Sequence, residues 1–295
     1  MKQGDLVTRK SYGGDIIFRI HQLEARRAVL RGVDYRLLAD SPLSDLAVVE
    51  PTEPFRYPHT AAPLVQGALQ RWELVRASIQ QRNPSSSGTS GAGKKPNSYF
   101  EVPGKVLHLD GDASYLRKSM TLYGELRVPA EGFFVPESEM ANALYRLLPQ
   151  IRPDIVVITG HDGILKNRKN DMHSLSSYKN SLNFVHAVTA ARQYDRNRDN
   201  LTIVAGACQS HFEALLQAGA NFASSPGRVL IHALDPLCIA AKVAYTSIKD
   251  TVSMTDIVSM TVSGLDGLGG VETRGTFRVG LPGIMHAAAT GEGAV

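Results

Sequence analysis

Two long apolar runs constrain the fold of this chain more than any other feature. Residues 154–160 read DIVVITG and residues 201–207 read LTIVAGA. A strand that is apolar on both faces must be covered on both sides, which is typical of parallel sheets. Shorter runs of this kind lie at 105–110 and 228–231, and stretches with helical character lie at 137–148, 182–192, 209–217 and 235–247. This alternation predicts an α/β layer with a mostly parallel sheet flanked by helices.

The N-terminal residues follow a different pattern. Short strands are predicted at 4–7, 15–20, 28–32 and 36–40, with a tight turn at 11–15. No convincing helix lies between them. Short strands with tight turns indicate a small SH3-like β-barrel module, a class that usually binds or positions a partner.

A change of composition separates these two parts. Residues 62–81 have apolar side chains at helical spacing, and residues 82–98 read RNPSSSGTSGAGKKPNS, which is typical of a flexible linker. We therefore predict a β module over residues 1–60, a helix and linker over 61–98, and an α/β domain over 99–295.

Composition and charge exclude several classes of protein. Hydrophobic residues make up 43% and charged residues 20% of the chain, an ordinary globular balance. No apolar stretch reaches about 18 residues, so we expect no membrane span, and the N-terminus lacks the apolar run of a secretory signal. The net charge of +4 comes from scattered Lys and Arg residues, and the short cluster at 166–169 favours a solvated loop over a nucleic-acid groove. We expect a protein of the cytoplasm.

The two cysteines do not indicate a disulfide framework in a chain of 295 residues. Cys238 lies in the apolar helical stretch LCIAA, so we predict that it belongs to the core. Cys208 follows a predicted buried strand, and His161 follows another. In open α/β sheets, ligands bind beyond the carboxyl ends of the strands, which is where both residues fall.

The position of Cys208 favours nucleophilic chemistry. We expect it near the N-terminus of the helix predicted at 209–217, where the helix dipole favours a thiolate. A neighbouring imidazole at His161 would lower the pKa of the thiol and protonate a leaving amine. The backbone N–H of Cys208, with one near Asp162 or Gly163, would form an oxyanion hole.

Other residues near this pair admit more than one role. His211 would share a helix face with Cys208, so it is an alternative base or half of a metal site, although lining the site is its preferred role. Two ligands without a second pair at metal spacing indicate no metal. The polar loop 170–174 would either close over a substrate or simply face solvent. The pattern of 251–262 is ambiguous, and the Gly-rich stretch 264–270 is interpreted as a turn.

The strand-end motifs support a family resemblance. The strings TGHDG, containing His161, and GAC, containing Cys208, resemble those of the clan that includes caspases, clostripain and gingipains. Asp162 stands between His161 and Gly163, a departure that shifts the N–H of Gly163 by one residue. Longer strings, such as ITGHDG and GACQSHFEALLQAGANFASSPGRVLIHALDP, resemble the YabG family of sporulation proteases over nearly the whole chain.

The resemblance implies a caspase-like fold for the α/β domain and a cysteine endopeptidase that acts in late sporulation. It also implies cleavage of spore-coat proteins, self-cleavage, preference for Arg before the scissile bond, and a place in the sporulating cell or spore coat. An Arg-specific pocket requires a carboxylate, and Asp162, Asp171 and Asp235 are the candidates. The sequence does not choose among them, and Asp235, ahead of Pro236, also fits a helix cap.

The expected mechanism is acyl transfer by Cys208 with His161, without a metal or organic cofactor. The expected partners are protein substrates, with neither nucleic acid nor membrane. Two alternatives remain at this stage. One is a non-enzymatic scaffold of the spore coat, in which Cys208 is a core residue. The other is a cysteine-dependent amidase or acyltransferase that acts on small amides.

Overall fold

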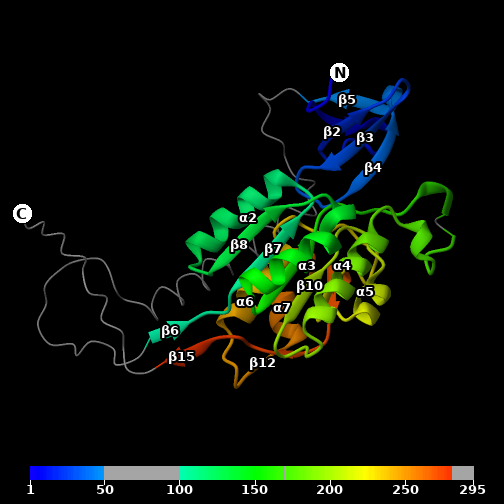
Figure 1. Ribbon diagram of the computed structural model, residues 1–295. Helices are drawn as coiled ribbons and strands as arrows, with labels where there is room; N and C mark the ends of the chain where they lie inside the picture. Colours follow the sequence, from blue (N-terminus) through cyan, green and yellow to red (C-terminus); the bar gives the residue numbers. More distant parts are fainter. Residues whose placement is uncertain (50–99, 169, 281–295) are drawn as a thin grey trace, which may run out of the picture.

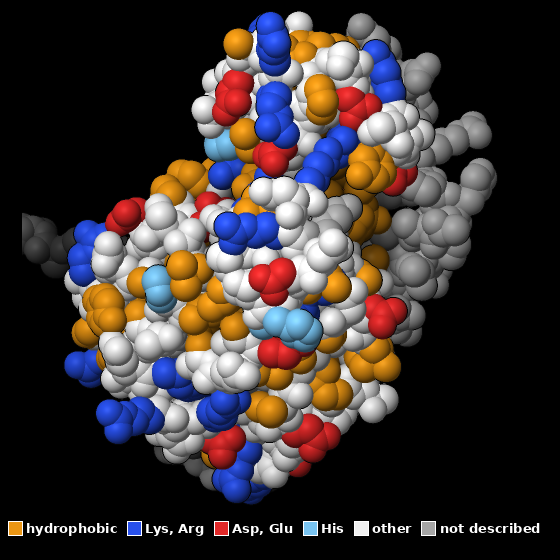
Figure 2. All heavy atoms as spheres, turned by 90° about the vertical axis from the view of Figure 1, so that its right-hand side faces the viewer, with side chains coloured by type: hydrophobic (Ala, Val, Ile, Leu, Met, Phe, Trp, Pro, Cys, Tyr) orange, Lys and Arg blue, Asp and Glu red, His pale blue; other side chains and the backbone are white. Residues whose placement is uncertain are grey.

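The computed structural model describes residues 1–49, 100–168 and 170–280, which form a small N-terminal lobe and a larger α/β lobe (Figure 1). The helix predicted at 62–81 and the linker predicted at 82–98 lie outside the described residues. Figure 2 shows the small lobe standing on the larger one. Lys and Arg side chains are spread over both lobes, and acidic side chains are interspersed among them.

The N-terminal lobe is an antiparallel sheet, in the strand order β4-β3-β2-β1-β5. Its strands are β1 (Leu6–Arg9), β2 (Phe18–Leu23), β3 (Arg27–Gly32), β4 (Leu38–Pro42) and β5 (Leu46–Val48), with short 3-10 turns η1 (Lys10–Tyr12) and η2 (Leu43–Asp45). The turn between β1 and β2 needs two glycines, because Gly13 and Gly14 both have positive φ. Val7, Phe18, Ile20, Ala28, Leu30 and Leu46 form its core. Closure of this sheet into an SH3-like barrel stays a prediction.

The described part of the larger lobe contains a six-stranded sheet in the order β13-β11-β10-β9-β7-β8. Its strands are β7 (Val106–Asp110), β8 (Ala130–Phe134), β9 (Ile155–Thr159), β10 (Thr202–Ala205), β11 (Phe222–Ser224) and β13 (Leu268–Gly270). All neighbours are parallel except β13, which runs antiparallel to β11. This is a doubly wound order, and its direction reverses between β7 and β9, the position at which such sheets bind ligands.

Helices cover both faces of this sheet (Figure 1). The helices are α2 (Ala113–Glu125), α3 (Met140–Ile151), α4 (Ser181–Tyr194), α5 (Phe212–Ala218), α6 (Asp235–Tyr245), α7 (Met254–Met260) and the single turn α8 (Gly264–Gly267). The 3-10 turns η3 (Glu137–Glu139), η4 (Lys166–Arg168) and η5 (Leu175–Ser177) lie in the connections. Two small ladders, β12 (Thr251–Val252) with β14 (Thr273–Arg274) and β6 (Phe100–Val102) with β15 (Arg278–Gly280), complete the described fold.

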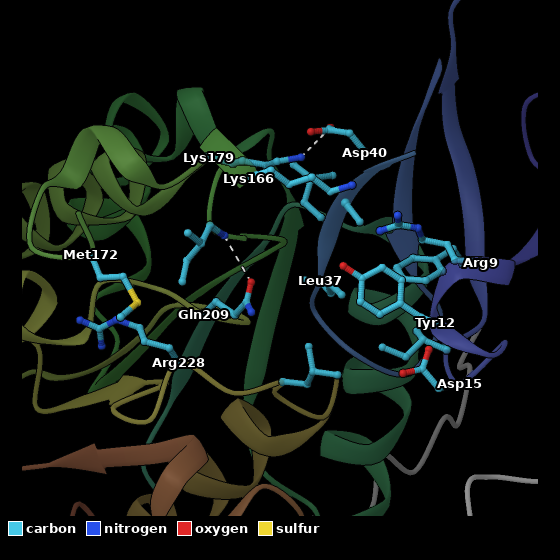
Figure 3. A pocket seen from close by; sticks show the side chains of 16 residues that line it. Arg9, Tyr12, Asp15, Leu37, Asp40, Lys166, Met172, Lys179, Gln209 and Arg228 are labelled. Atoms are coloured by element: carbon cyan, nitrogen blue, oxygen red, sulfur yellow. Dashed lines mark hydrogen bonds and ion pairs between the residues drawn. The ribbon is translucent and has the colours of Figure 1, made fainter. Parts of the chain in front are cut away.

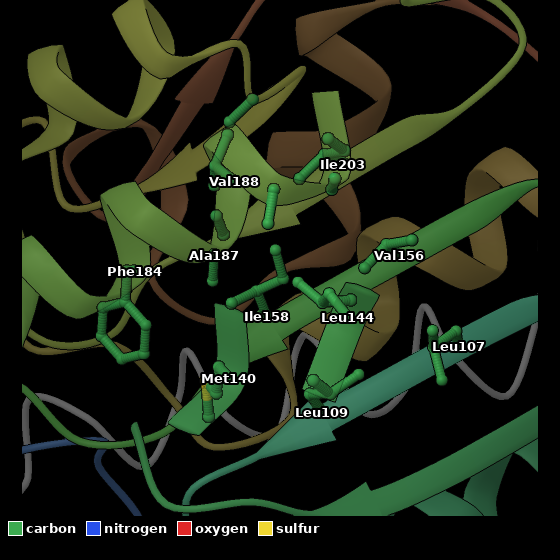
Figure 4. Close-up of a cluster of buried hydrophobic side chains, with 14 of the residues drawn as sticks. Leu107, Leu109, Met140, Leu144, Val156, Ile158, Phe184, Ala187, Val188 and Ile203 are labelled. Atoms are coloured by element: carbon green, nitrogen blue, oxygen red, sulfur yellow. The ribbon is translucent and has the colours of Figure 1, made fainter. Parts of the chain in front are cut away.

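The alternation of side chains along the buried strands builds two cores. Val156 and Ile158 of β9 pack with α3, α4 and α5, the cluster drawn in Figure 4. Ile155 and Val157 point to the other face and pack with α2, α6 and α7. Cys238 belongs to this second core, as predicted. Each buried strand therefore needs apolar residues at every position, which is the pattern that the sequence shows.

Three predicted elements differ from the structure. The helix predicted at 209–217 begins only at Phe212, because positive φ angles at Gly206 and Gln209 turn the chain sharply after β10. The segment 228–231 is not a strand of the sheet. The Gly-rich stretch 264–270, predicted as a turn, forms α8 and then the edge strand β13, whose glycines fit closely against Phe222 and Phe212.

Candidate active site

His161 and Cys208 leave the same edge of the sheet. Strands β9 and β10 are parallel neighbours, with Ile158 opposite Ala205. His161 lies three residues after Ile158, and Cys208 lies three residues after Ala205. One carbonyl oxygen joins the two loops. The Arg36 oxygen accepts hydrogen bonds from the backbone N–H of Cys208 and that of Asp162, both at 3.2 Å. The loops that carry the imidazole and the thiol are thus adjacent, as the sequence predicts.

The thiol of Cys208 is fully buried. Its Sγ accepts a hydrogen bond from the N–H of Ile231 at 3.0 Å and lies 3.6 Å from the carbonyl oxygen of the same residue. Burial raises the pKa of the thiol well above its usual range, and the N–H of Ile231 and the charge of Arg36 offset only part of this rise. Cys208 is therefore a protonated thiol while the site is closed.

His161 is also fully buried, and its ring stacks on Tyr115 with the centroids 5.3 Å apart. The Nε2 atom lies 3.8 Å from Oδ2 of Asp112. Burial lowers the pKa of His161 to about 3, although the carboxylate of Asp112 favours the charged form. Among the residues that the structure describes, neither ring nitrogen has a hydrogen-bond partner. His161 is therefore a neutral imidazole in the closed site, with the carboxylate of Asp112 near its Nε2 atom.

A second buried pair lies beside the thiol. Arg36, which connects β3 to β4 in the N-terminal lobe, extends its side chain into the α/β lobe. Its Nη1 and Nη2 donate to Oδ1 and Oδ2 of Asp110 at 3.1 and 3.0 Å, and its Nε donates to the carbonyl oxygen of Ala233 at 3.0 Å. The Arg36 guanidinium carbon lies 4.9 Å from the centre of the Tyr115 ring. This pocket satisfies an arginine with a carboxylate, a carbonyl and an aromatic face.

The carboxylate of Asp110 is held in its charged form. It ends β7, next to the point where the strand order reverses. Burial would raise its pKa, but the charge of Arg36 and the nearby His108, whose Nε2 lies 3.5 Å from Oδ2, bring the pKa well below its usual range. The N–H of Asp112 also donates to Asp110 Oδ1 at 2.9 Å. Asp110 is therefore a preorganised site for a cation at the edge of the sheet.

Comparison with known proteins identifies the family of the chain. Residues 2–282 match the model of the YabG peptidase U57 family. The chain is 42% identical, over 285 residues, to the sporulation-specific protease YabG of Bacillus subtilis (strain 168), an alignment that covers 95% of this chain and 97% of the relative. The chain belongs to the YabG peptidase family. No solved structure matches the chain.

Within this YabG family member, the side chain of Asp162 and the N–H of Gly163 contact each other. The carboxylate of Asp162 accepts hydrogen bonds from the N–H of Gly163 at 2.8 Å and from the hydroxyls of Ser181 and Ser210 at 2.5 and 2.9 Å. The side chain of Asp162 thus braces three loops and does not reach the arginine pocket. The N–H of Asp162, and not that of Gly163, donates to the Arg36 carbonyl oxygen together with the N–H of Cys208. The sequence leaves both positions open.

The side chains of the remaining predicted substrate-binding residues contact groups other than Arg36. Asp171 is exposed on a loop. Asp235 is buried at the start of α6 and accepts from the N–H groups of Val262 and Ser263 at 2.8 and 3.0 Å, so it holds the end of α7 in place. His211 caps α5, and its Nε2 contacts the carbonyl oxygen of His173 at 2.9 Å, which anchors the 170–174 loop.

Sequence reasoning missed both members of the arginine pocket. The signal for Asp110 was present, because it is a polar residue at the end of the predicted strand 105–110, at the same sheet edge as the two reactive residues. Nothing local indicates Arg36, whose partner lies 74 residues away in the chain.

A cavity of about 550 Å³ opens between the two lobes, next to Leu37 and Leu38 (Figure 3). Leu37 and Asp40 form its wall on the N-terminal lobe, and Gln209 and Arg228 lie opposite. Lys179 bridges the lobes at its rim through an ion pair with Asp40 at 2.7 Å. The chain that follows Arg36 therefore runs along an open groove.

Residues 1–49, 100–168 and 170–280 contain no cluster of His, Cys, Asp and Glu suited to a metal ion. None of their helices has the length and apolar character needed to cross a membrane.

Proposed function

We propose that this peptidase is a cysteine endopeptidase that cleaves after arginine, with Cys208 as nucleophile and His161 as general base and acid. One observation carries the proposal. A peptide carbonyl, that of Arg36, lies between the backbone N–H groups of Cys208 and Asp162, while the side chain of the same residue fills a pocket that ends in Asp110. An arginine substrate would need this arrangement of donors and carboxylate.

The proposed reaction uses only residues of this chain. His161 takes the proton from the Cys208 thiol as the sulfur attacks the carbonyl carbon of an arginine residue. The N–H groups of Cys208 and Asp162 stabilise the oxyanion, and each such donor is worth about 3–4 kcal/mol in other acyl-transfer enzymes. His161 then protonates the leaving amine, and water activated by the same imidazole releases the acyl group. The carboxylate of Asp112, 3.8 Å from Nε2, stabilises the charged form of the imidazole during these steps.

The biological role is proposed from the relative. The Bacillus subtilis protein is a sporulation-specific protease by name, and the identity of 42% extends over nearly the whole of both chains. We assign the present chain a peptidase role in sporulation, with spore-coat proteins and the chain itself as substrates.

The test compares the wild-type chain with Cys208→Ala on an unfolded, arginine-containing protein. Cys238→Ala is the matched control, because it removes the other thiol from the second core. We expect wild type and Cys238→Ala to produce fragments ending in arginine, and Cys208→Ala to produce none. Equal fragmentation by Cys208→Ala would contradict a cysteine mechanism. A wild type that hydrolyses small arginine amides but leaves the protein intact would favour the amidase alternative.

A further inference from the structure

Residues 34–38 pass through the site as an extended segment with backbone hydrogen bonds on both sides. On one side, the N–H of Arg36 donates to the carbonyl oxygen of Ile231 at 3.0 Å, and the Asp34 oxygen accepts from the N–H of Ala233 at 2.9 Å. On the other side, the N–H of Leu38 donates to the Asp162 oxygen at 2.8 Å. This is strand addition, the usual way in which a peptide is held by main-chain contacts.

The strand-like contacts are made by Ile231 and Ala233, at the end of the segment 228–231 that was predicted as a strand and just beyond it. Tyr35 and His232 form an antiparallel bridge, and Leu37 forms a parallel bridge with Asp162. The segment therefore lies between the two loops that carry the sulfur and the imidazole. Arg36 fixes the register of the segment in the site. Its carbonyl oxygen accepts from two N–H donors, and its side chain binds the buried carboxylate of Asp110.

The covering of the site follows from the same contacts. Both Cys208 and His161 are fully buried, and the hydroxyl of Tyr115, whose ring stacks on His161, donates to the carbonyl oxygen of Tyr35 at 3.0 Å. While the segment is in place, a second polypeptide cannot reach the thiol or the carboxylate of Asp110. The N-terminal lobe thus occupies the site from within its own chain.

We propose that residues 34–38 are an internal substrate that blocks the active site until the Arg36–Leu37 peptide bond is cut. This inference rests on the proposed function. The sulfur of Cys208 bonds to the carbonyl carbon of Arg36, the bond from that carbon to the nitrogen of Leu37 breaks, and His161 gives its proton to the new amine. Water then cleaves the thioester, which leaves a carboxylate on Arg36 and restores the thiol.

The cut breaks the covalent connection between β3 and β4, since Arg36 lies between these strands in the chain. The strand β4 keeps its ladder to β3, but its covalent link to the arginine is lost. Residues 1–36 are then held only by non-covalent contacts and can leave the pocket. We expect release to open the pocket of Asp110 and the groove of Figure 3 to other arginine-containing chains.

The test follows the purified full-length chain by intact mass and N-terminal sequencing, together with cleavage of an added unfolded protein. We expect wild type to yield a fragment that begins at Leu37, with a first-order rate that is unchanged over a tenfold range of protein concentration. Arg27→Gln, which alters an exposed arginine of β3, is the matched control and should be cut like wild type. Arg36→Gln should remain intact at this bond.

Arg36→Gln removes a buried charge and can fail to fold, so Leu37→Pro is the second variant. It keeps Arg36 and its ion pair while placing a proline after the scissile carbonyl, and we expect it to stay uncut and to cleave the added protein at least tenfold more slowly than wild type. A wild type that degrades the added protein while the Arg36–Leu37 bond stays intact would overturn the internal substrate and leave the proposed function standing. Equal degradation by Cys208→Ala would instead overturn the proposed function.

Discussion

The guanidinium of Arg36 and the carboxylate of Asp110 form two hydrogen bonds, at 3.0 and 3.1 Å, in a place where neither side chain is exposed. A paired geometry of this kind suits arginine and not lysine, whose ammonium is a single point charge. Removing a charge from water is costly, so a buried pair of this type is poor evidence for stability alone. We propose that the pair serves recognition, because it sets a peptide carbonyl beside Cys208.

The first prediction concerns this recognition. Asp110→Asn should lower kcat/KM for an arginine peptide by about 30- to 3,000-fold, since loss of one partner of a buried charge pair costs about 2–5 kcal/mol and about 1.4 kcal/mol is tenfold. Steady-state cleavage of a fluorogenic arginine peptide measures the change. Asp171→Asn, which alters an exposed loop acid, is the control and should match wild type. A loss of less than threefold for Asp110→Asn would place the specificity elsewhere.

The second prediction separates bracing from recognition. Asp162→Asn should destabilise the chain by about 2–3 kcal/mol, because the buried hydroxyls of Ser181 and Ser210 lose the oxygen that accepts their hydrogen bonds. For a lobe of this size the melting temperature should fall by roughly 4–12 °C. The preference for arginine over lysine peptides should not change, and a change in that ratio would return Asp162 to the pocket.

The third prediction concerns access to the thiol. Cys208 of the uncut Leu37→Pro chain should react with iodoacetamide at least about tenfold more slowly than Cys208 of the cut wild type, because burial raises its pKa and the thiolate is the reactive form. Mass spectrometry of the labelled peptide gives both rates. In denaturant the two chains should label equally, which controls for reagent and sequence. Equal rates in the folded state would show that residues 34–38 do not protect the sulfur.

The sheet was predictable because the apolar character of its central strands can be seen in the local sequence. Strands β9 and β10 are apolar at every position, and this requires cover on both faces. Strand β8 was missed because its sequence, AEGFF, lacks such a run and forms only at the edge of the sheet. The helix α5 was begun too early, since sequence periodicity does not reveal the positive φ of Gln209.

The site was only half predictable, for a related reason. His161 and Cys208 follow buried strands, and parallel strands end at one edge, so their proximity follows from the pattern. The N–H of Gly163 donates to the carboxylate of Asp162, and this leaves the N–H of Asp162 as the donor to the Arg36 carbonyl oxygen. Tertiary contacts decide this arrangement, so the sequence does not predict it. Arg36 belongs to another lobe, and no periodicity in either lobe predicts that it enters the site.

The fourth prediction concerns pH and stability. Burial lowers the pKa of His161 to about 3, against an ordinary value near 6.5 for the unfolded chain. Between these values the unfolded chain binds a proton that the folded chain does not, so folding becomes less favourable as the pH falls below about 6.5. The contribution of one such histidine is up to about 1.4 kcal/mol per pH unit. The measurement uses the Cys208→Ala background, in which the chain should stay intact.

Melting temperatures at pH 7.5, 6.5, 5.5 and 5.0 should therefore fall less steeply for His161→Gln than for its parent. Buried His108, whose pKa is also lowered by burial, contributes to both chains and cancels in the comparison. The exposed His173 supplies the control, because His173→Gln should follow the parent at every pH. Parallel curves for His161→Gln and the parent would mean that the imidazole is already solvated in the intact chain, and the closed site described for residues 34–38 would then be open.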